Sequence, residues 1–452
     1  MFVPYKDILI KKSQLKSASI NISGYKHAAV QLIAASVIHK NPVIINNAPK
    51  ILDTVVLAKI VEECGGKANF EGQVLSLNTQ KLVKSKVPPN LSKQIHGSLY
   101  FLPALLARLG KVEFFKAGGC QIGNENDKGE RPIEHMLSVM ESFGAEFFKD
   151  GEWIKGQCEQ YRPTTIDILS YSDNPISPNG PYVSGATKTA ILCAMGCKEG
   201  TTRILNPYMK PDVVELLLFL KKCGYIVEFN KKEINITIPI STFPCTYNLM
   251  SDISEMFTFI ALSVHTRIPL QLKGVTVERA KKGLYAELEL LEAMGIKLKW
   301  GNSSVFVEPV EEIIAQNIQV TSTGIYSDHH PFFTLMLLKA NGTSTIEEYV
   351  WRDRFKYIEG LKALGANIKR DCNLIEIKPS ILLQSGKTLT ANELRGAAVL
   401  ILASLTISGT TIVKSVDHII RGYENFFEKL ELIGVKITFL ESASIDSGEI
   451  IK

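Results

Sequence analysis

Several familiar sequence signals are missing from this chain of 452 residues. Its eight cysteines form no CxxC pair and no Cys/His cluster at zinc-ligand spacing, so no zinc module is predicted. No block of five or more Lys and Arg residues occurs, and a formal charge of +5 is too small to indicate a nucleic-acid surface. The longest apolar run, about residues 397–407, is too short to span a bilayer.

The N-terminal stretch MFVPYKDILIKK contains no apolar segment of signal-peptide length. We therefore expect a cytoplasmic protein with free thiols and with neither a membrane nor a nucleic-acid partner. Glycine (32) and proline (19) are unpatterned, which excludes a collagen-like chain, and 45% apolar residues exclude a disordered one. The length predicts several domains rather than one core.

What the sequence does contain is a unit that occurs six times. Each copy reads as an amphipathic helix, a glycine and a short strand, because the apolar period changes from about 3.6 to about 2 at the glycine. Upstream of each copy lies a second helix that is apolar on nearly all faces and is predicted to be buried. The glycines should cap the helices in the left-handed region, and they are spaced by 79, 80, 71, 70 and 69 residues: Gly65, Gly144, Gly224, Gly295, Gly365 and Gly434.

The repeat predicts an α/β protein of two similar domains, each a ring of strands that encloses buried helices. The spacing falls after the third copy, so we assign three units to each domain. The first domain is expected to span residues 21–245, and the second to combine residues 1–20 with residues 246–452. The N-terminal segment would then pair with the last unit. A repeat solenoid is the alternative, but solenoid repeats are usually about 20 to 50 residues long.

Polar clusters open the six buried helices. Helix N-termini carry unpaired N–H groups and the positive end of the helix dipole, so a cleft that gathers several of them would bind an anion. Ser23, Ser251 and Asn392 are interpreted as helix caps or first-turn residues. Lys26 and Arg395 are interpreted as functional, because an unpaired cation is costly to bury.

The second copy departs from the others, since GGCQIGNENDKGERPIEH follows its strand. The glycines allow close approach of the backbone, and Cys120 stands at the start of this loop. Nearby cations such as Lys128 and Arg131 would lower the pKa of its thiol, so Cys120 is the candidate reactive cysteine. The cysteines in apolar helical stripes are interpreted as core residues: Cys64, Cys193, Cys197 and Cys223.

The segments GGCQIG and RPIEH together resemble the cysteine loop of the UDP-N-acetylglucosamine enolpyruvyl transferases (1-carboxyvinyltransferases). SGYKHAAVQLIAASVI and NNAPKILDT resemble two earlier motifs of that family. Its later motifs are matched in the same order by SGATKTAILCA, SDHHPFFTLMLL, VWRDRF, ELRGAAVLILA and HIIRGYENFFEKL. The resemblance covers nearly the whole chain, in register with the repeat. The related 5-enolpyruvylshikimate-3-phosphate synthases share the architecture but not the GGC loop.

The resemblance implies two inside-out α/β barrels with the active site between them. It also implies a transferase that moves the enolpyruvyl group of phosphoenolpyruvate to the 3-hydroxyl of UDP-N-acetylglucosamine and releases phosphate, the first committed step of peptidoglycan precursor synthesis. Lys26 and Arg395 would bind phosphoenolpyruvate, Cys120 would protonate its C3, and Asp328 would accept the hydroxyl proton. Such chemistry needs a general acid and a general base on opposite sides of one carbon, but no cofactor and no metal.

A second set of residues is implied to line the substrate site. Arg354 and Arg421 would face the phosphates. The others would line the nucleotide-sugar site: His27, His96, Arg131, Pro132, Ile133, Glu134, His135, Pro181, Tyr182, Val183, Ser184 and Val350. His329 and His330 beside Asp328 do not predict a metal site, because adjacent histidines point in different directions and no further ligand is suitably spaced.

The chain departs from the family pattern at the site itself. His27 stands for Asn, His96 for Arg and Ile420 for Asp, and about six extra residues fall within residues 124–130. We expect reduced activity on the peptidoglycan acceptor. A related transferase with a different nucleotide or sugar acceptor is therefore an alternative, and a catalytically silent binding protein of the same fold is another. A homo-oligomer is left open.

Overall fold

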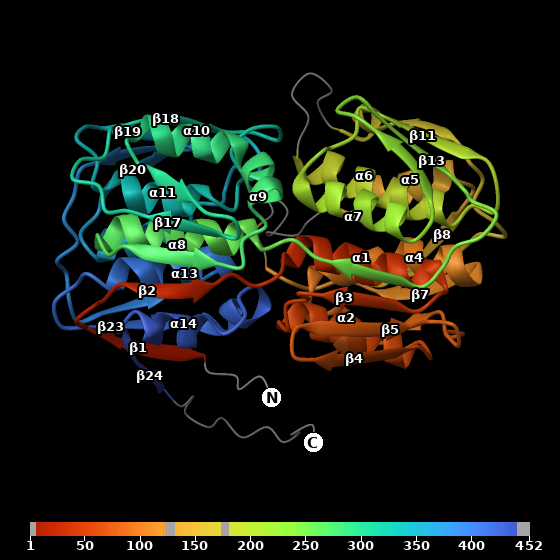
Figure 1. Ribbon diagram of the computed structural model, residues 1–452, viewed down its shortest axis with the longest axis horizontal. Helices are drawn as coiled ribbons and strands as arrows, with labels where there is room; N and C mark the ends of the chain where they lie inside the picture. The colour runs from red at the N-terminus through yellow and green to blue at the C-terminus, as the bar shows by residue number, and fades with distance from the viewer. Residues whose placement is uncertain (1–5, 121, 123–131, 173–179, 441–452) are drawn as a thin grey trace.

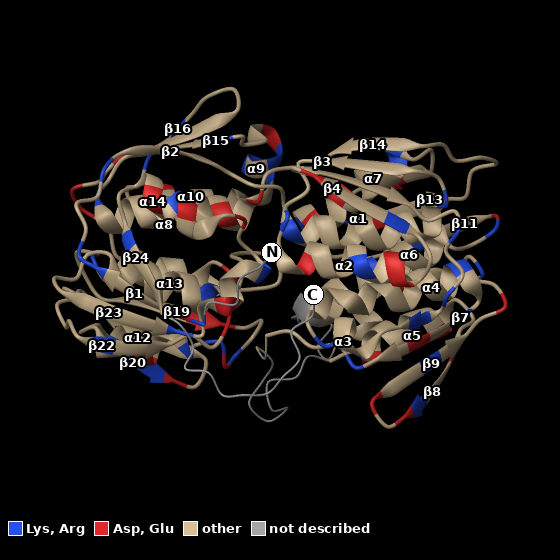
Figure 2. Cartoon of the chain, turned by 90° about the horizontal axis from the view of Figure 1, so that it is seen from below, with Lys and Arg blue, Asp and Glu red and all other residues tan. Residues whose placement is uncertain are grey.

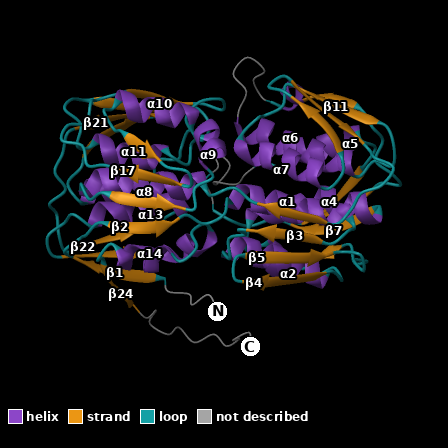
Figure 3. Ribbon diagram, viewed as in Figure 1, coloured by secondary structure: helices purple, strands orange, loops and turns teal. Residues whose placement is uncertain are grey.

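The computed structural model describes residues 6–120, 122, 132–172 and 180–440, without the side chains of residues 180 and 181. The chain forms two halves of similar build that lie side by side (Figure 1). Sheets lie on the outside of each half and helices between them (Figure 3), which confirms the expected α/β architecture. Within the described part of the chain, no helix combines the length and the apolar character needed to cross a bilayer.

Among the described residues, six four-stranded sheets repeat one pattern, in which a parallel pair of strands is extended by two antiparallel strands. In the first half the sheets are, strand by strand, β14 (Cys245–Asn248), β3 (Val43–Asn46), β5 (Val74–Asn78) and β4 (Lys67–Glu71); β6 (Lys86–Val87), β7 (Lys111–Phe115), β9 (Trp153–Gln157) and β8 (Glu146–Asp150); and β10 (Thr165–Asp167), β11 (Thr201–Leu205), β13 (Glu233–Thr237) and β12 (Ile226–Phe229). In the second half they are β2 (Ala18–Asn21), β15 (Leu270–Lys273), β17 (Ser304–Val307) and β16 (Leu298–Trp300); β18 (Asn317–Val320), β19 (Ser344–Glu348), β21 (Leu374–Lys378) and β20 (Asn367–Asp371); and β22 (Lys387–Thr390), β23 (Thr410–Lys414), β1 (Asp7–Lys11) and β24 (Lys436–Leu440).

Three of these sheets are completed by strands from distant parts of the chain. β14 pairs with β3, and β2 pairs with β15. β1 lies between β23 and β24, so the expected pairing of the N-terminal segment with the last unit is confirmed. The division of the chain at residues 20/21 and 245/246 stays a prediction, and the strands nearest to it end at Asn21 and Asn248.

The inner helices of each half contact one another and are buried on nearly all faces: α1 (Lys26–His39), α4 (Phe101–Leu109) and α6 (Gly180–Met195), and α8 (Ile253–Thr266), α11 (His330–Leu337) and α13 (Leu394–Ser404). The helices that end at the repeat glycines are α2 (Leu52–Glu63), α5 (Glu134–Ser142), α7 (Pro211–Lys222), α10 (Tyr285–Ala293), α12 (Tyr357–Ala363) and α14 (Phe426–Leu432). Short helical pieces complete the described elements: α3 (Pro89–Ser92), α9 (Val277–Gly283) and the 3₁₀ helices η1 (His96–Tyr100), η3 (Ile168–Tyr171) and η4 (Val416–Arg421).

The C-terminal ends of the helices agree with the sequence prediction, and the N-terminal ends differ from it. All six repeat glycines have positive φ, from 82° to 110°, as the left-handed cap requires. The prediction that Ser23, Ser251 and Asn392 are N-caps or first-turn residues was wrong, because each of them lies before the cap position of its helix. Asp252 and Glu393 cap α8 and α13, because a carboxylate one position later accepts two amide N–H groups in each helix. The cap position of α1 lies two residues past Ser23.

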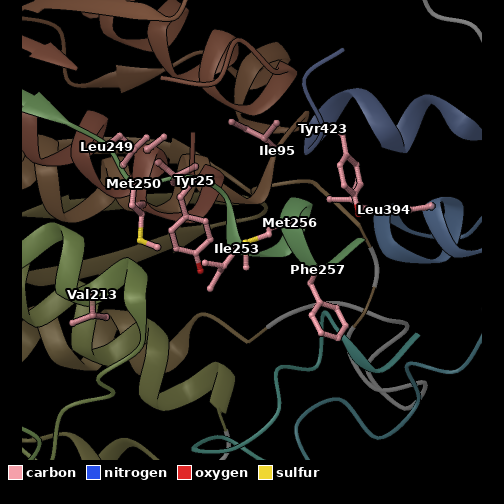
Figure 4. Close-up of a cluster of buried hydrophobic side chains, with 14 of the residues drawn as sticks. Tyr25, Ile95, Val213, Leu249, Met250, Ile253, Met256, Phe257, Leu394 and Tyr423 are labelled. Atoms are coloured by element: carbon pink, nitrogen blue, oxygen red, sulfur yellow. The ribbon is translucent and has the colours of Figure 1, made fainter. Parts of the chain in front are cut away.

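Within the described residues, two connectors join the halves: residues 22–25, between β2 and α1, and residues 249–252, between β14 and α8. The two connectors are hydrogen-bonded to each other. The backbone N–H of Tyr25 donates to the carbonyl of Met250 over 2.9 Å, and that of Asp252 donates to the carbonyl of Ser23 over 2.7 Å. Apolar side chains of both segments gather at this point (Figure 4). Because α1 and α8 begin directly after the two connectors, their N-termini start from a common place between the halves.

Candidate active site

A cavity of about 260 Å³ is lined by residues of both halves. Charged segments of both signs lie along the facing sides of the halves (Figure 2). The cavity brings together many of the residues that the sequence singled out: Lys26, His27, His96, Cys120, Pro132, His135, Ser184, Asp328, Val350, Arg354 and Arg421. These positions span almost 400 residues of the chain, so only the fold makes them neighbours.

The two glycines before Cys120 let its loop pass close to the backbone behind it. A Cβ on Gly118 would lie 1.6 Å from the carbonyl oxygen of Lys93. Gly119 has a φ of +111°, and a Cβ there would lie 3.0 Å from the backbone nitrogen of His96. No side chain fits at either position, which confirms the close approach expected from the sequence. The packing fixes where the thiol enters the cavity.

The Cys120 thiol lies between two basic side chains from η4 of the opposite half. Nη1 of Arg421 donates to Sγ over 2.9 Å, and Nδ1 of His418 lies 3.7 Å from Sγ. Burial raises the pKa of the thiol, but the hydrogen bond with His418 and the charge of Arg421 outweigh burial and bring the pKa of Cys120 down to about 7. A large fraction of this group is therefore thiolate at neutral pH.

An ion-pair chain connects this thiol to the first turn of α1. Nζ of Lys26 lies 2.9 Å from Asp53, and Nε of Arg421 lies 3.3 Å from the other oxygen of the same carboxylate. Asp53 sits in the first turn of α2 and is 3% exposed. Burial raises its pKa, but Lys26 and Arg421 outweigh burial and hold the pKa of Asp53 below its usual range. Lys26 and Arg421 thus both line the cavity, and the same buried carboxylate, that of Asp53, holds them in position.

Asp328 lies at the start of the fifth buried helix and is held by basic groups. Nη1 of Arg354 lies 2.6 Å and Nε of Arg395 lies 3.1 Å from its two oxygens, and Nε2 of His27 lies 3.6 Å away. Burial raises the pKa of Asp328, but the charges of Arg354 and Arg395 outweigh burial and keep this pKa well below its usual range. Glu393, which caps α13, pairs with Arg354 over 3.2 Å. The carboxylate of Asp328 is therefore ionised and rigidly placed.

The turn that carries Asp328 rests on two buried carboxylates. Glu348 accepts from Oγ of Ser327 over 2.7 Å and lies 3.4 Å from His330. Glu287 lies 3.0 Å from Nδ1 of His329. His329 and His330 thus point to different partners, and the described residues include no cluster suited to a metal ion. Burial raises the pKa of Glu348 to about 7.

Some predicted site residues lie away from the cavity. The side chain of Glu134 is exposed and pairs with Lys149 over 2.7 Å. Tyr182 packs edge-on against His135, Val183 is buried in the core, and Ile133 packs against it. Arg131, residues 124–130 and the side chain of Pro181 fall outside the described residues. Arg395 contacts Asp328 rather than the cavity wall itself.

The cavity also has members that sequence reasoning left without a role. Asp53 and His418 stand within quoted motifs, NNAPKILDT and HIIRGYENFFEKL, but their partners lie far away in the chain. Lys188 forms a buried ion pair with Asp212 over 2.5 Å. Lys210 also faces the cavity. The signal that could have found Lys210 and Asp212 is a charged residue at the start of a helix, and for Lys188 it is a cation in the middle of an otherwise apolar helix.

Comparison with known proteins places this site in a family. The sequence family described as EPSP synthase (3-phosphoshikimate 1-carboxyvinyltransferase) matches residues 10–430. UDP-N-acetylglucosamine 1-carboxyvinyltransferase of Campylobacter jejuni is 31% identical over 431 residues, which cover 94% of this chain and 97% of that protein. The enzyme of the same name from Halothermothrix orenii is 30% identical and covers 95% and 98%.

Solved structures agree with this assignment. The enolpyruvyl transferase NikO from Streptomyces tendae superposes with a TM-score of 0.89 at 32% identity, covering 96% of this chain and 99% of that one. EPSP synthase from Acinetobacter baumannii shares the fold, with a TM-score of 0.73 at 14% identity. The fold is therefore the pair of inside-out α/β barrels that the resemblance implied. The chain belongs to the enolpyruvyl (carboxyvinyl) transferase family, and it is a transferase of that family.

Proposed function

We propose that this protein transfers the enolpyruvyl group of phosphoenolpyruvate to the 3-hydroxyl of UDP-N-acetylglucosamine and releases inorganic phosphate. In that role it would catalyse the first committed step of peptidoglycan precursor synthesis. The names of its relatives support the reaction and the acceptor. The observation that carries the proposal is that Cys120 and Asp328 line one cavity together with Lys26, Arg354 and Arg421.

The proposed reaction has two stages. In the first, the thiol of Cys120 gives a proton to C3 of phosphoenolpyruvate, the acceptor oxygen bonds to C2, and Asp328 takes the hydroxyl proton. In the second, the C2–O bond to phosphate breaks, and the thiolate of Cys120 takes a proton back from C3. The products are the enolpyruvyl ether and inorganic phosphate. A thiol with a pKa of about 7 suits both directions of this proton transfer.

Substrate binding would adjust the base. In the free protein, Arg354 and Arg395 hold the pKa of Asp328 well below its usual range, which makes it a weak proton acceptor. Arg395 and Lys26 are the groups proposed to bind phosphoenolpyruvate, and the bound anion would neutralise part of their charge. The pKa of Asp328 would then rise toward the range in which it can accept a proton. The base would thus gain strength only when phosphoenolpyruvate is in place.

A different nucleotide or sugar acceptor is the second candidate. His27 lies 3.6 Å from the proposed base, at a position where the resemblance led us to expect Asn, and His96 also lines the cavity. An imidazole beside Asp328 would change both the shape and the hydrogen bonding offered to the reacting hydroxyl. The similarity to NikO, an enolpyruvyl transferase from Streptomyces tendae, also supports this candidate.

The proposal is tested by phosphate release and by mass spectrometry. The protein is incubated with phosphoenolpyruvate and, in turn, UDP-N-acetylglucosamine, uridine monophosphate, uridine and N-acetylglucosamine. We expect phosphate release with an enolpyruvyl product 70 mass units heavier than its acceptor, and loss of at least about 100-fold in kcat for Cys120→Ser and for Asp328→Asn. Cys372→Ser, at an exposed cysteine, is the matched control and should keep full activity.

The outcomes separate the three readings. Product with UDP-N-acetylglucosamine supports the first, and product only with another acceptor supports the second. Absence of any product, together with no change of any property in Cys120→Ser and Asp328→Asn, would identify a silent binding protein of the same fold.

A further inference from the structure

The RGYE segment, residues 421–424, ends in a charged residue that the proposed reaction does not use. Arg421 contacts Cys120, but Glu424 is not part of the cavity wall. Glu424 is nevertheless only 8% exposed. A buried carboxylate is costly unless it is hydrogen-bonded, so the partners of Glu424 indicate what it does.

Both hydrogen-bond donors to Glu424 belong to the opposite half. One oxygen accepts from the backbone N–H of Lys50 over 2.8 Å, and the other accepts from Nε2 of Gln73 over 2.7 Å. Lys50 stands two residues before α2 begins, and Gln73 lies in the turn between β4 and β5. The carbonyl of Gln73 also accepts from the N–H of Ala48 over 2.8 Å, so the two donors are parts of one packed surface. Glu424 therefore joins the halves through two charge-assisted hydrogen bonds.

The turn that carries Glu424 is also fixed within its own half. Oη of Tyr423 lies 2.8 Å from Oγ1 of Thr258 on α8, and the Tyr423 ring packs against that of Phe426. Tyr423 thus holds the turn to the second half, while its neighbours Arg421 and Glu424 both reach into the first. A turn that is held on both sides sets the distance between the halves at this point.

The same turn places the cation that acidifies Cys120. Nη1 of Arg421 donates to Sγ over 2.9 Å, and Nε of Arg421 lies 3.3 Å from Asp53 in the first turn of α2. Both contacts require η4, which ends at Arg421, to lie against the start of α2. Because Glu424 is bonded to the backbone just before α2, it limits how far η4 and α2 can separate.

We infer that Glu424 is a positioning residue that joins the two halves and thereby holds Arg421 against the Cys120 thiol. This inference rests on the proposed role of Cys120 as proton donor, and it adds to the reaction a residue that contacts no substrate. A direct effect of its charge would have the opposite sign, because a nearby carboxylate disfavours a thiolate. Removing that charge alone would make the thiol more acidic, whereas displacing Arg421 makes it less acidic. The direction of the change therefore separates the two effects.

The test follows Cys120 alkylation by iodoacetamide across a pH series, in the full-length protein without substrates, by peptide mass spectrometry. We expect Glu424→Ala to raise the midpoint by at least about half a pH unit, because a displaced Arg421 favours the thiolate less. Gln73→Ala, on an exposed turn, should raise the midpoint about half as far, since one of the two hydrogen bonds remains. Glu424→Gln should stay within about 0.2 pH unit of wild type, because its amide can keep both bonds once the Gln73 amide turns round.

A control variant and a kinetic measurement complete the test. Glu308→Ala removes a carboxylate that pairs with Lys299 over 2.6 Å within the second half, so its midpoint should equal that of wild type. With phosphoenolpyruvate and UDP-N-acetylglucosamine, Glu424→Ala should lower kcat by roughly 10-fold, because both proton transfers of Cys120 depend on an acidity near neutrality. Glu424→Gln should restore most of that rate.

The remaining outcomes overturn the inference. A folded Glu424→Ala with an unchanged or lowered midpoint would show that Glu424 only stabilises the fold. If thermal unfolding shows that Glu424→Ala does not fold, an unchanged midpoint in Gln73→Ala rejects the inference instead. A shift in Glu424→Gln as large as that in Glu424→Ala would contradict the hydrogen-bond account. Absence of any product with wild type would refute the proposed function separately, because the alkylation midpoints decide the role of Glu424 without an acceptor.

Discussion

At the scale of single residues, the acidity of Cys120 depends on groups that lie about 300 residues away in the chain. His418 is separated from it by 298 positions and Arg421 by 301. We predict that the rate of Cys120 alkylation by iodoacetamide rises with pH through a midpoint of about 7, because the thiolate is the reacting form. In His418→Ala the midpoint should move upward by about one pH unit, since the hydrogen bond that favours the thiolate is lost. Peptide mass spectrometry across a pH series measures both midpoints.

Arg203→Gln is the matched control for this experiment. Arg203 forms an exposed ion pair with Glu233 on the outer sheet and does not line the cavity, so its loss should leave the midpoint where it is. An unchanged midpoint in His418→Ala would show that this imidazole does not set the acidity of the thiol.

The sequence could predict which residues matter more easily than what each of them touches. Lys26, Cys120 and Arg395 stand out because a cation or a thiol at a helix or loop entrance conflicts with apolar surroundings. Asp53 and His418 carry no such local signal. They matter because the two halves pack face to face, and this packing brings Asp53 within 3.3 Å of Arg421. Pairings across the cavity are set by tertiary packing, and no local pattern encodes them.

At the scale of elements, the glycine after each amphipathic helix is tested by alanine. Gly434 has a φ of +93°, and a Cβ there would lie 2.7 Å from the carbonyl oxygen of Gln14. Gly72 also has positive φ, +58°, but nothing lies within 4 Å of its Cβ position. We predict that Gly72→Ala lowers the free energy of unfolding by about 1 kcal/mol, the conformational cost alone. Gly434→Ala should cost more than about 2 kcal/mol, because steric overlap with backbone adds to that cost.

Thermal unfolding midpoints of the two variants, compared with wild type, measure this difference. Equal midpoints would mean that the backbone at residues 14 and 434 moves apart at no cost in stability. Glycine would then be needed at residue 434 only for its positive φ.

The repeat was readable because each helix-to-strand junction carries its own local signal, a change of apolar period at a glycine. Helix starts were less readable. Ser251 was predicted as a cap, but Asp252 accepts from the N–H groups of Ser254 and Glu255. Ser251 and Asp252 are both good capping residues, so the local sequence cannot decide which of them caps the helix. The choice depends on the connector, where Ser251 instead bonds to Thr276 over 2.9 Å.

At the scale of the whole molecule, the paired connectors control how the halves meet. Gly24 bridges Ser251 across the two segments, and a Cβ on Gly24 would lie 1.7 Å from the carbonyl oxygen of Asn47. We predict that Gly24→Ala displaces this connector, lowers the free energy of unfolding by about 1–3 kcal/mol and raises the KM of phosphoenolpyruvate. The second effect follows because Lys26 stands only two residues further along the chain.

Steady-state kinetics and thermal unfolding of Gly24→Ala measure the two effects. Gly342→Ala is the control, since a Cβ there would make an ordinary contact of 3.4 Å with Ala315. Normal kinetics in a destabilised Gly24→Ala would show that the connectors hold the fold without setting the position of Lys26.

The guanidinium of Arg421 belongs to one half, while Asp53 and Cys120, which it contacts, belong to the other. Drawing the halves apart would remove this contact, and the sulfur would return to its protonated, unreactive form. The reactivity of the Cys120 thiol thereby depends on contact between the two halves. With the halves apart, the protonated thiol would react slowly with electrophiles and oxidants. With the halves in contact, the thiolate forms and can react.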